Sequence, residues 1–223
     1  MTYFTQLKAF IAKEISLEWR EKQAINSILL YLTTTIFVCY LSFRFKETKI
    51  DPIVWNALFW IIILFTGINA VAKSFLQESQ GRLIYYYTLI SPQILIVAKM
   101  IYNALLMLVI GFLALLVYTV IMGNPVQDML LFSLSIFLGA IGFSTTLTLV
   151  SGIASKVKNS SVMVAILGFP IILPMLLMLI KLSKNAMDGL ALSASYDELM
   201  TLSALSTIVV AVSYILFPYL WRA

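Results

Sequence analysis

The residues able to carry chemistry are few in this sequence, and their types exclude most catalytic functions. There is no histidine, and the one cysteine, Cys39, lies within an apolar run. The chain therefore has no imidazole base for a serine nucleophile, no His-Glu-x-x-His metal pair and no Walker-type phosphate loop. If the protein uses energy, that energy must enter from a partner.

The densest set of polar residues is the stretch QESQGRLIYYYTLISPQILIVAKM, residues 77–100. Its first part predicts a short surface helix, broken at Gly81, that presents Gln77, Glu78 and Arg82 to a partner. Leu83 and the tyrosines Tyr85–Tyr87 are expected at headgroup depth, where aromatic rings settle, and Lys99 is expected to extend its ammonium to the same level. The alternative interpretation is a solvated loop beside an ordinary aromatic belt.

Membrane spans must position these residues. Of the 223 residues, 61% are hydrophobic and 11% are charged, whereas soluble domains average about 45–50% and about 25%. Residues 1–223 are predicted to form one all-α transmembrane domain with no soluble part. We attribute the net charge of +5 to loops that flank the membrane, and no pattern of nucleic-acid binding accompanies it.

Six uncharged apolar segments are the predicted spans, because about 20 helical residues cross the bilayer core. Every charged residue lies outside them, which disfavours ion-coupled transport, since relays need ionisable groups inside the membrane. In chain order the segments are Ile25–Phe43, Ile53–Ala72, Met100–Met122, Met129–Ala154, Val162–Ile180 and Leu199–Leu220.

Two further segments are predicted at the membrane surface. Residues 3–22 form an amphipathic helix whose apolar residues recur at steps of three and four, namely Phe4, Leu7, Ile11 and Ile15. This helix is expected in the membrane interface, and the alternative is a cytosolic helix that packs on a partner. Residues 181–198 are expected to be an outer segment that includes a short interfacial helix.

The loop charges orient the chain. With six spans, ten of the fifteen Lys and Arg residues fall on the side of the N-terminus and five on the other. The side richer in Lys and Arg is normally cytoplasmic. Both termini and residues 75–90 are therefore predicted to face the cytoplasm.

Pro170 and Pro174 lie four residues apart in the fifth predicted span. Each removes a backbone hydrogen bond and bends the helix toward the same side. Such a helix either flexes between two packings or holds a fixed kink. We favour the fixed kink, because proline is common in membrane helices for packing reasons alone.

The fourth predicted span carries small residues on one side, Ser135, Gly139 and Gly142. Small residues let another helix approach closely, so this side is a candidate helix-packing seam. The approaching helix belongs either to a second copy of the chain or to the same chain.

The stretch ESQGRLIYYYTLISPQILIVAK resembles the acidic-x-x-Gly-x-Leu, Ser/Thr-Pro and Lys pattern of ABC-2-type transporter permeases, in which it forms the cytosolic element that engages the ATPase subunit. The paired prolines of GFPIILPMLLMLI, in a six-span chain of this length, resemble those of the cytochrome c maturation protein B (CcmB) family. That family is the permease-like subunit of the haem exporter. The likeness extends over essentially the whole chain, and the tyrosine triplet, which departs from it, receives no family role.

The resemblance implies a non-catalytic permease subunit of the bacterial inner membrane. This subunit would form a homodimer, bind two copies of a separate ATPase and work with a haem-handling membrane protein. Glu78, Gly81 and Arg82 would fall in the ATPase-coupling element, flanked by Gln77 and Leu83.

Haem is expected as cargo of the complex, not as a cofactor of this chain. Haem iron is usually held by His, Cys, Met or Tyr, and with no histidine and one buried cysteine the iron ligand is expected to come from a partner. Two alternatives stay open: an ABC-2-type permease for a lipid, polysaccharide or drug, and a scaffold that transports nothing but remodels a partner when ATP is hydrolysed.

Overall fold

The computed structural model describes residues 3–20, 22–44, 50–71, 91–155 and 160–222, and within these ranges the chain is helical and contains no strand. The predicted all-α membrane class is confirmed, because six described helices are long and apolar enough to cross a membrane. The elements are α1 Tyr3–Arg20, α2 Lys22–Arg44, α3 Pro52–Val71, α6 Pro92–Met122, α7 Met129–Ala154, α8 Ser160–Met187, the short 3-10 helix η1 Leu192–Ser195 and α9 Tyr196–Arg222.

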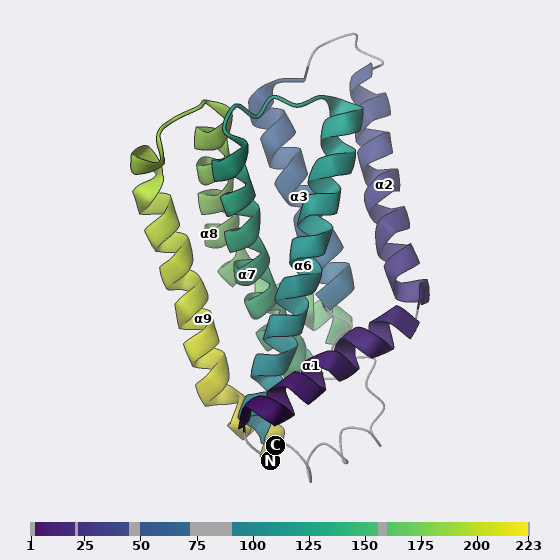
Figure 1. Cartoon of the computed structure of the whole chain (residues 1–223), viewed down its shortest axis with the longest axis vertical. Coiled ribbons are helices and arrows are strands. Elements are labelled where there is room, and N and C mark those ends of the chain that lie inside the picture. Colours follow the sequence, from purple (N-terminus) through teal and green to yellow (C-terminus); the bar gives the residue numbers. More distant parts are fainter. Residues whose placement is uncertain (1–2, 21, 45–49, 72–90, 156–159, 223) are drawn as a thin grey trace.

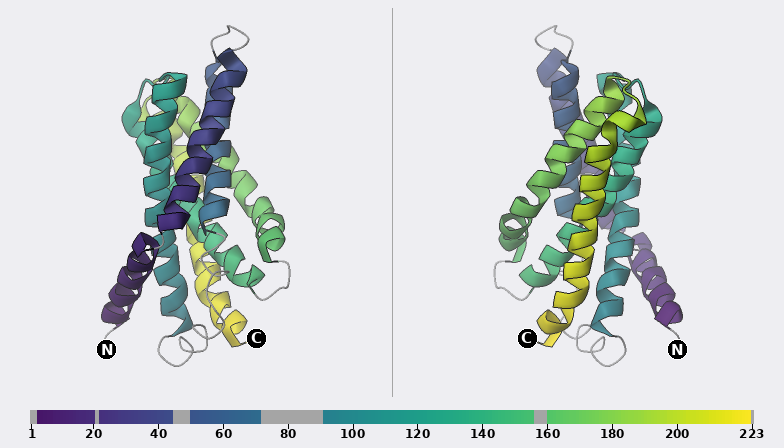
Figure 2. Two further views of the ribbon diagram at one scale, coloured as in Figure 1. Left: turned by 90° about the vertical axis from the view of Figure 1, so that its right-hand side faces the viewer. Right: turned by 90° about the vertical axis from the view of Figure 1, so that its left-hand side faces the viewer.

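The six long helices stand side by side, and α1 crosses one end of the bundle obliquely (Figure 1). Both chain termini lie at that end, which is called the terminal end below (Figure 1, Figure 2). Helix α7 is the centre of the packing, since it contacts α3, α6, α8 and α9. Helix α2 stands at the edge against α3 and α6, and most of its side chains are exposed, as expected for a surface that faces lipid.

Small residues explain why α7 can be central. Almost every residue from Gly142 to Gly152 is buried, and this stretch consists largely of Ser, Thr and Gly. Their hydroxyl groups mostly bond back to carbonyls of the preceding turn, as Thr145 does to Ile141 at 2.8 Å. These residues therefore add little bulk and leave no free donor, so four neighbours can approach.

An aromatic cluster fills the bundle between α3, α6 and α7. Trp55 stacks on Phe59 at 5.7 Å between ring centroids and lies 4.7 Å from Tyr118. The Tyr118 hydroxyl donates to the Trp55 carbonyl oxygen at 3.1 Å, and the Trp55 indole donates to Gly123 at 3.2 Å. Aromatic pairs of this kind each stabilise by about 0.5–1.5 kcal/mol beyond simple burial, so the cluster is a rigid part of the core.

Helices α6 and α8 extend furthest beyond the predicted spans. Helix α6 begins at Pro92 instead of Met100, because Pro is well suited to the first helical position, where its missing N–H has no partner to lose. Helix α8 continues past Ile180 to Met187. The helix continues past Lys181 and Lys184, because long cationic side chains near its end can reach water. Their charge also interacts favourably with the carbonyl groups at the helix C-terminus.

The end of α8 replaces the short interfacial helix expected within residues 181–198. Gly189 has φ of +67°, and the Leu190 N–H donates to Asn185 at 3.0 Å, the arrangement of a Schellman motif. A turn and η1, which spans only four residues, then lead into α9 at Tyr196. The first part of the expected segment thus belongs to α8, and its last part to α9.

Candidate functional site

The predicted coupling residues Gln77, Glu78, Gly81, Arg82 and Leu83 lie outside the described residues, as do Tyr85–Tyr87. The helices on either side of them are described. Helix α3 ends at Val71 and α6 begins at Pro92, both at the terminal end of the bundle (Figure 1). A partner that binds this connection would therefore act directly on the start of α6.

A small apolar cluster surrounds the start of α6 and is separate from the main core. It joins the first two turns of α6 to α1 and to the end of α9, through the buried residues Phe10, Leu95, Ile96, Ala98, Met100 and Phe217. On α1, Leu7 and Ile11 pack against it, whereas Phe4 and Ile15 point outward with 73% and 47% of their surface exposed. The predicted apolar stripe is thus divided between the side that contacts α6 and the exposed side.

Lys99 is buried against α1, and the level that its ammonium reaches in the membrane stays a prediction. It lies inside α6, its side chain is 0% exposed, and its ammonium is 3.8 Å from the Glu14 carboxylate of α1. Glu14 is itself 12% exposed and also binds Lys13 at 3.0 Å. The sequence shows Lys99 only among apolar neighbours, and α1 brings a carboxylate to it in the structure.

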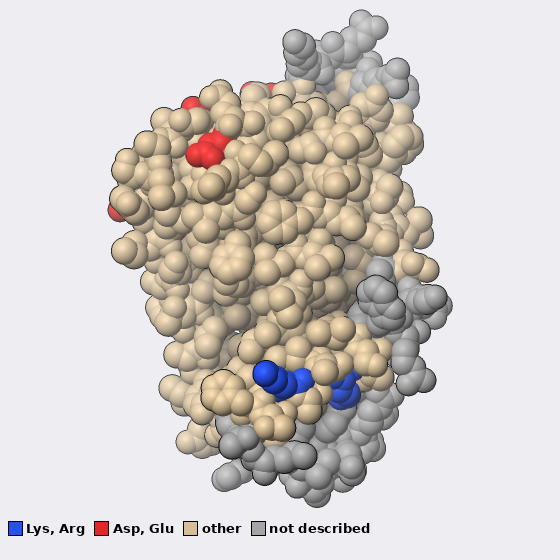
Figure 3. All heavy atoms as spheres, in the orientation of Figure 1, with Lys and Arg blue, Asp and Glu red and all other residues tan. Residues whose placement is uncertain are grey.

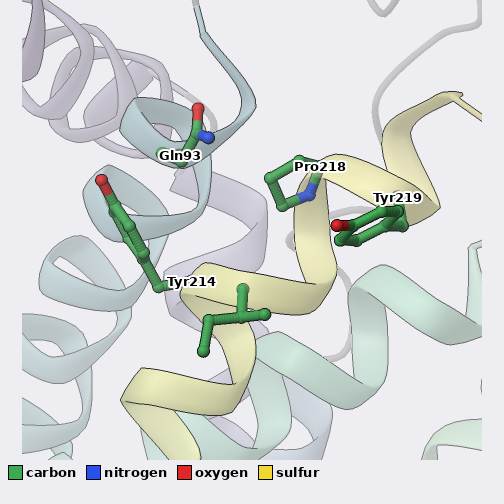
Figure 4. Close-up of a pocket in the computed structure, with 5 residues that line it drawn as sticks. Gln93, Tyr214, Pro218 and Tyr219 are labelled. Atoms are coloured by element: carbon green, nitrogen blue, oxygen red, sulfur yellow. The ribbon is translucent and has the colours of Figure 1, made fainter.

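A groove of about 300 Å³ opens between the first turn of α6 and the last turns of α9. It is lined by Gln93, Tyr214, Ile215, Pro218 and Tyr219, with Tyr219 on the far side of Pro218 from Gln93 and Tyr214 (Figure 4). Because proline has no N–H, the Tyr214 carbonyl has no intrahelical donor. The groove combines an apolar wall with phenol and amide groups, a composition typical of protein surface at headgroup depth.

Pro170 and Pro174 both lie on the exposed side of α8. The helix remains continuous from Ser160 to Met187, and its terminal-end half slants away from the bundle axis (Figure 2). Each proline leaves one carbonyl of the preceding turn without an intrahelical donor. The fixed kink and the flexible hinge both stay predictions for this helix.

The small residues of α7 face helices of the same chain. Ser135, Gly139 and Gly142 are all buried. A Cβ built on Gly139 would lie 2.7 Å from the Trp60 ring of α3, and one on Gly142 would lie 3.3 Å from Met175 of α8. Of the two interpretations of this seam, these contacts describe packing within one subunit.

A buried polar network between α3 and α8 has no counterpart in the sequence analysis. Ser183 is at its centre: the Trp60 indole donates to its hydroxyl at 2.8 Å, and the hydroxyl lies 2.7 Å from Asn56 Oδ1. The Asn56 amide donates to the Ile180 carbonyl at 2.8 Å. The sequence shows Asn56 as a polar residue inside a predicted span. It does not show that the partner of Asn56 is Ser183, more than a hundred residues away.

Basic and acidic side chains are distributed unequally on one face of the bundle. On the face shown in Figure 3, basic atoms lie toward the terminal end and acidic atoms toward the opposite end. At the opposite end Lys184 pairs with Asp188 at 2.8 Å, and Asp128 caps α7 by accepting from the N–H groups of Leu130 and Leu131. Within the described ranges no group of His, Cys, Asp and Glu is arranged to hold a metal ion.

Comparison with known proteins places this architecture in a family. No curated protein and no solved structure matches the chain significantly. The family model described as CcmB protein matches residues 5–218, which includes α1, all six long helices and the connection between α3 and α6. With this match over nearly its whole length, the chain belongs to the CcmB protein family.

Proposed function

We propose that this chain converts ATP hydrolysis by a separate subunit into movement of its helix bundle during cytochrome c maturation. As a CcmB family member, the chain is a membrane component of the haem-exporting ABC system of cytochrome c maturation, and members of the family are permease subunits. The lack of histidine and of a phosphate-binding loop in the sequence carries the assignment of ATP hydrolysis to a partner.

The terminal end of the bundle faces the cytoplasm in this proposal, and the membrane is the bacterial inner membrane. The sequence assigns ten of fifteen Lys and Arg residues to that end, and the acidic side chains of Asp51, Asp188 and Asp197 belong to the opposite end. This asymmetry follows the positive-inside rule. Both chain termini and residues 75–90 are then accessible to a cytosolic ATPase.

The proposed coupling element is the connection between α3 and α6, with Glu78, Gly81 and Arg82 as its contact residues and Gln77 and Leu83 beside them. Two features support it. The connection joins two helices that belong to the core, and it leads without further linker into the buried first turns of α6. Binding there can therefore displace packed helices rather than a loose tail.

A second copy of the chain and a haem-handling membrane protein complete the proposed complex, with haem as cargo. The outward sides of α2, α8 and α9 leave surface for these partners as well as for lipid. On each of them large apolar side chains are exposed, for example Leu30, Leu177 and Met200 at 70%, 57% and 72%.

The coupling assignment is tested by reversing two charges together, Glu78→Lys and Arg82→Glu. We expect this variant to lose co-purification with the ATPase or to uncouple ATP turnover from cytochrome c maturation. The matched control reverses the same charge types in the connection between α2 and α3, Glu47→Lys with Lys49→Glu. Unchanged ATPase binding, turnover and maturation in the first variant would reject the assignment.

The scaffold hypothesis remains the second candidate, and the packed interior favours it. The centre of the bundle is filled by Trp55, Phe59, Trp60 and Phe143, each no more than 2% exposed. Vesicles containing this chain and the ATPase separate the two functions. ATP-dependent movement of haem across the bilayer supports transport, and release of a haem-carrying partner without such movement supports a scaffold.

A further inference from the structure

The attachment of α1 to the bundle is narrow. Helix α1 packs mainly on α6 and makes a smaller contact with α2. Among the described side chains of α1, Phe10 is the buried one, with 4% of its surface exposed. It belongs to the small cluster at the start of α6. Among the side chains of α1 that the structure describes, none belongs to the main core. The contacts with the first turns of α6 are therefore the main attachment of α1 to the bundle, and they determine whether α1 moves with α6.

An ion pair reinforces this attachment. The Lys99 side chain is 0% exposed, so its ammonium has lost the water that would otherwise solvate it. The Glu14 carboxylate, 12% exposed and 3.8 Å away, supplies opposite charge from α1. A buried charge pair is costly to separate, because opposite charges attract each other more strongly in a medium of low polarity than in water. This pair therefore opposes any sliding of α1 along α6.

Helix α6 is divided between two packing regions along its length. The apolar residues between Leu95 and Met100 belong to the small cluster with α1 and α9, and the buried apolar residues from Met107 to Tyr118 belong to the main core. Lys99 lies seven residues after Pro92, about two helical turns. The charge pair thus holds α1 to the segment of α6 that comes directly after residues 75–90 and before the main core.

We propose that Glu14 and Lys99 are positioning residues that clamp α1 to the first turns of α6, so that the two helices move as one body when the ATPase acts. This inference rests on the proposed coupling role of residues 75–90. In this proposal α1 moves together with α6 when the ATPase acts. An amphipathic helix that only anchors the chain would keep its position in the membrane interface. The exposed Phe4 and Ile15 on its outer side then carry that motion into the membrane interface.

Distance measurements test the clamp directly. Spin labels are placed at Lys8→Cys, on the exposed side of α1, and at Gln93→Cys in the first turn of α6, in a Cys39→Ala background and in complexes with one labelled subunit. A second pair joins Lys8→Cys to Ser155→Cys at the end of α7. We expect the 8–93 distance to be the same with and without bound ATP, and the 8–155 distance to change. A nucleotide-dependent change in the 8–93 distance would overturn the proposal.

A double-mutant cycle separates clamping from ordinary stability. In Glu14→Gln we expect normal ATPase binding and turnover but about tenfold less cytochrome c maturation per ATP, a size common for coupling between distant sites. Lys99→Met alone leaves Glu14 its ion pair with Lys13 but removes the clamp, so it is expected to lower coupling as Glu14→Gln does. The double variant Glu14→Gln/Lys99→Met is expected to stay uncoupled, because the pair is absent, and full recovery of coupling in it would overturn the clamp. Lys8→Gln, an exposed charge on the same helix, is the control and should retain full coupling. Wild-type coupling in Glu14→Gln contradicts the clamp.

The clamp and the proposed function can fail separately. If the wild-type chain binds no ATPase, the proposed function fails. The clamp is then still measured in the purified chain, where Glu14→Gln and the double variant should both broaden the 8–93 distance distribution. An unchanged distribution in Glu14→Gln overturns the clamp whatever the ATPase does.

Discussion

Replacing Gly139 by alanine tests one of the closest helix contacts in the bundle. The new Cβ would lie 2.7 Å and 2.9 Å from two carbons of the Trp60 ring and 3.3 Å from Leu179 Cδ1. Trp60 cannot easily move away, because it is 1% exposed and its indole donates to Ser183 at 2.8 Å. The substitution therefore forces either the α3–α7 distance or the indole hydrogen bond to change.

The expected destabilisation follows from three contributions. Overpacking a well-packed site costs about 1–3 kcal/mol, and a weakened indole hydrogen bond adds about 0.5–1.5 kcal/mol. Alanine returns about 0.5–1 kcal/mol through its better helix propensity. Gly139→Ala is therefore expected to lower the free energy of unfolding by about 1–3 kcal/mol.

Gly142 provides the matched control on the same helix. A Cβ there would lie 3.3 Å from Met175 Sδ and from Ser206 Oγ, and the methionine thioether can adjust. Gly142→Ala should change stability by less than about 1 kcal/mol. Unfolding of the detergent-solubilised protein by SDS titration, followed by tryptophan fluorescence, measures both variants. Equal stability of the two variants would refute the argument that a pinned indole makes Gly139 special.

Three further predictions concern the polar network, a helix cap and the prolines. Ser183→Ala should lower the free energy of unfolding by about 1–3 kcal/mol in the same titration, because the Trp60 indole and Asn56 Oδ1 lose their partner. The control Ser193→Ala, at an exposed position, should have no effect. Asp128→Ala should cost about 0.5–2 kcal/mol and speed hydrogen exchange in the first turn of α7, since two N–H groups lose their acceptor, and Asp128→Asn should largely preserve the cap. If the prolines of α8 only fix a kink, Pro170→Ala/Pro174→Ala should retain cytochrome c maturation; a well-folded double variant without maturation would instead indicate a hinge.

Most of the fold was predictable because the bilayer restricts what an apolar segment can do. A lipid-exposed backbone must satisfy its own hydrogen bonds, so a run such as Met129–Ala154 has helix as its only single-segment solution. Its predicted and observed ends coincide. Ends were less predictable where polar residues follow the apolar run, as at Ile180, because a helix continues until its backbone is diverted, here at Gly189.

The site was less predictable, because its residues gain meaning from partners that are distant in sequence. Lys99 has the sequence context of a residue that reaches out to headgroups, yet the structure buries it beside Glu14. Asn56 and Ser183 are ordinary polar residues in apolar runs until α3 and α8 bring them within 2.7 Å. The coupling residues around Glu78 stay a prediction from sequence.

The sequence by itself determined the class of the protein, its six spans and its charge asymmetry. These depend on residue type and local spacing, which the chain displays directly. Only the tertiary structure decided that α1 is bound to α6 through a buried ion pair, and that the small residues of α7 admit Trp60 and Met175 of the same chain. The physical reason is that burial and charge pairing depend on which helices pack together. Side chains far apart in sequence interact only where their helices are in contact.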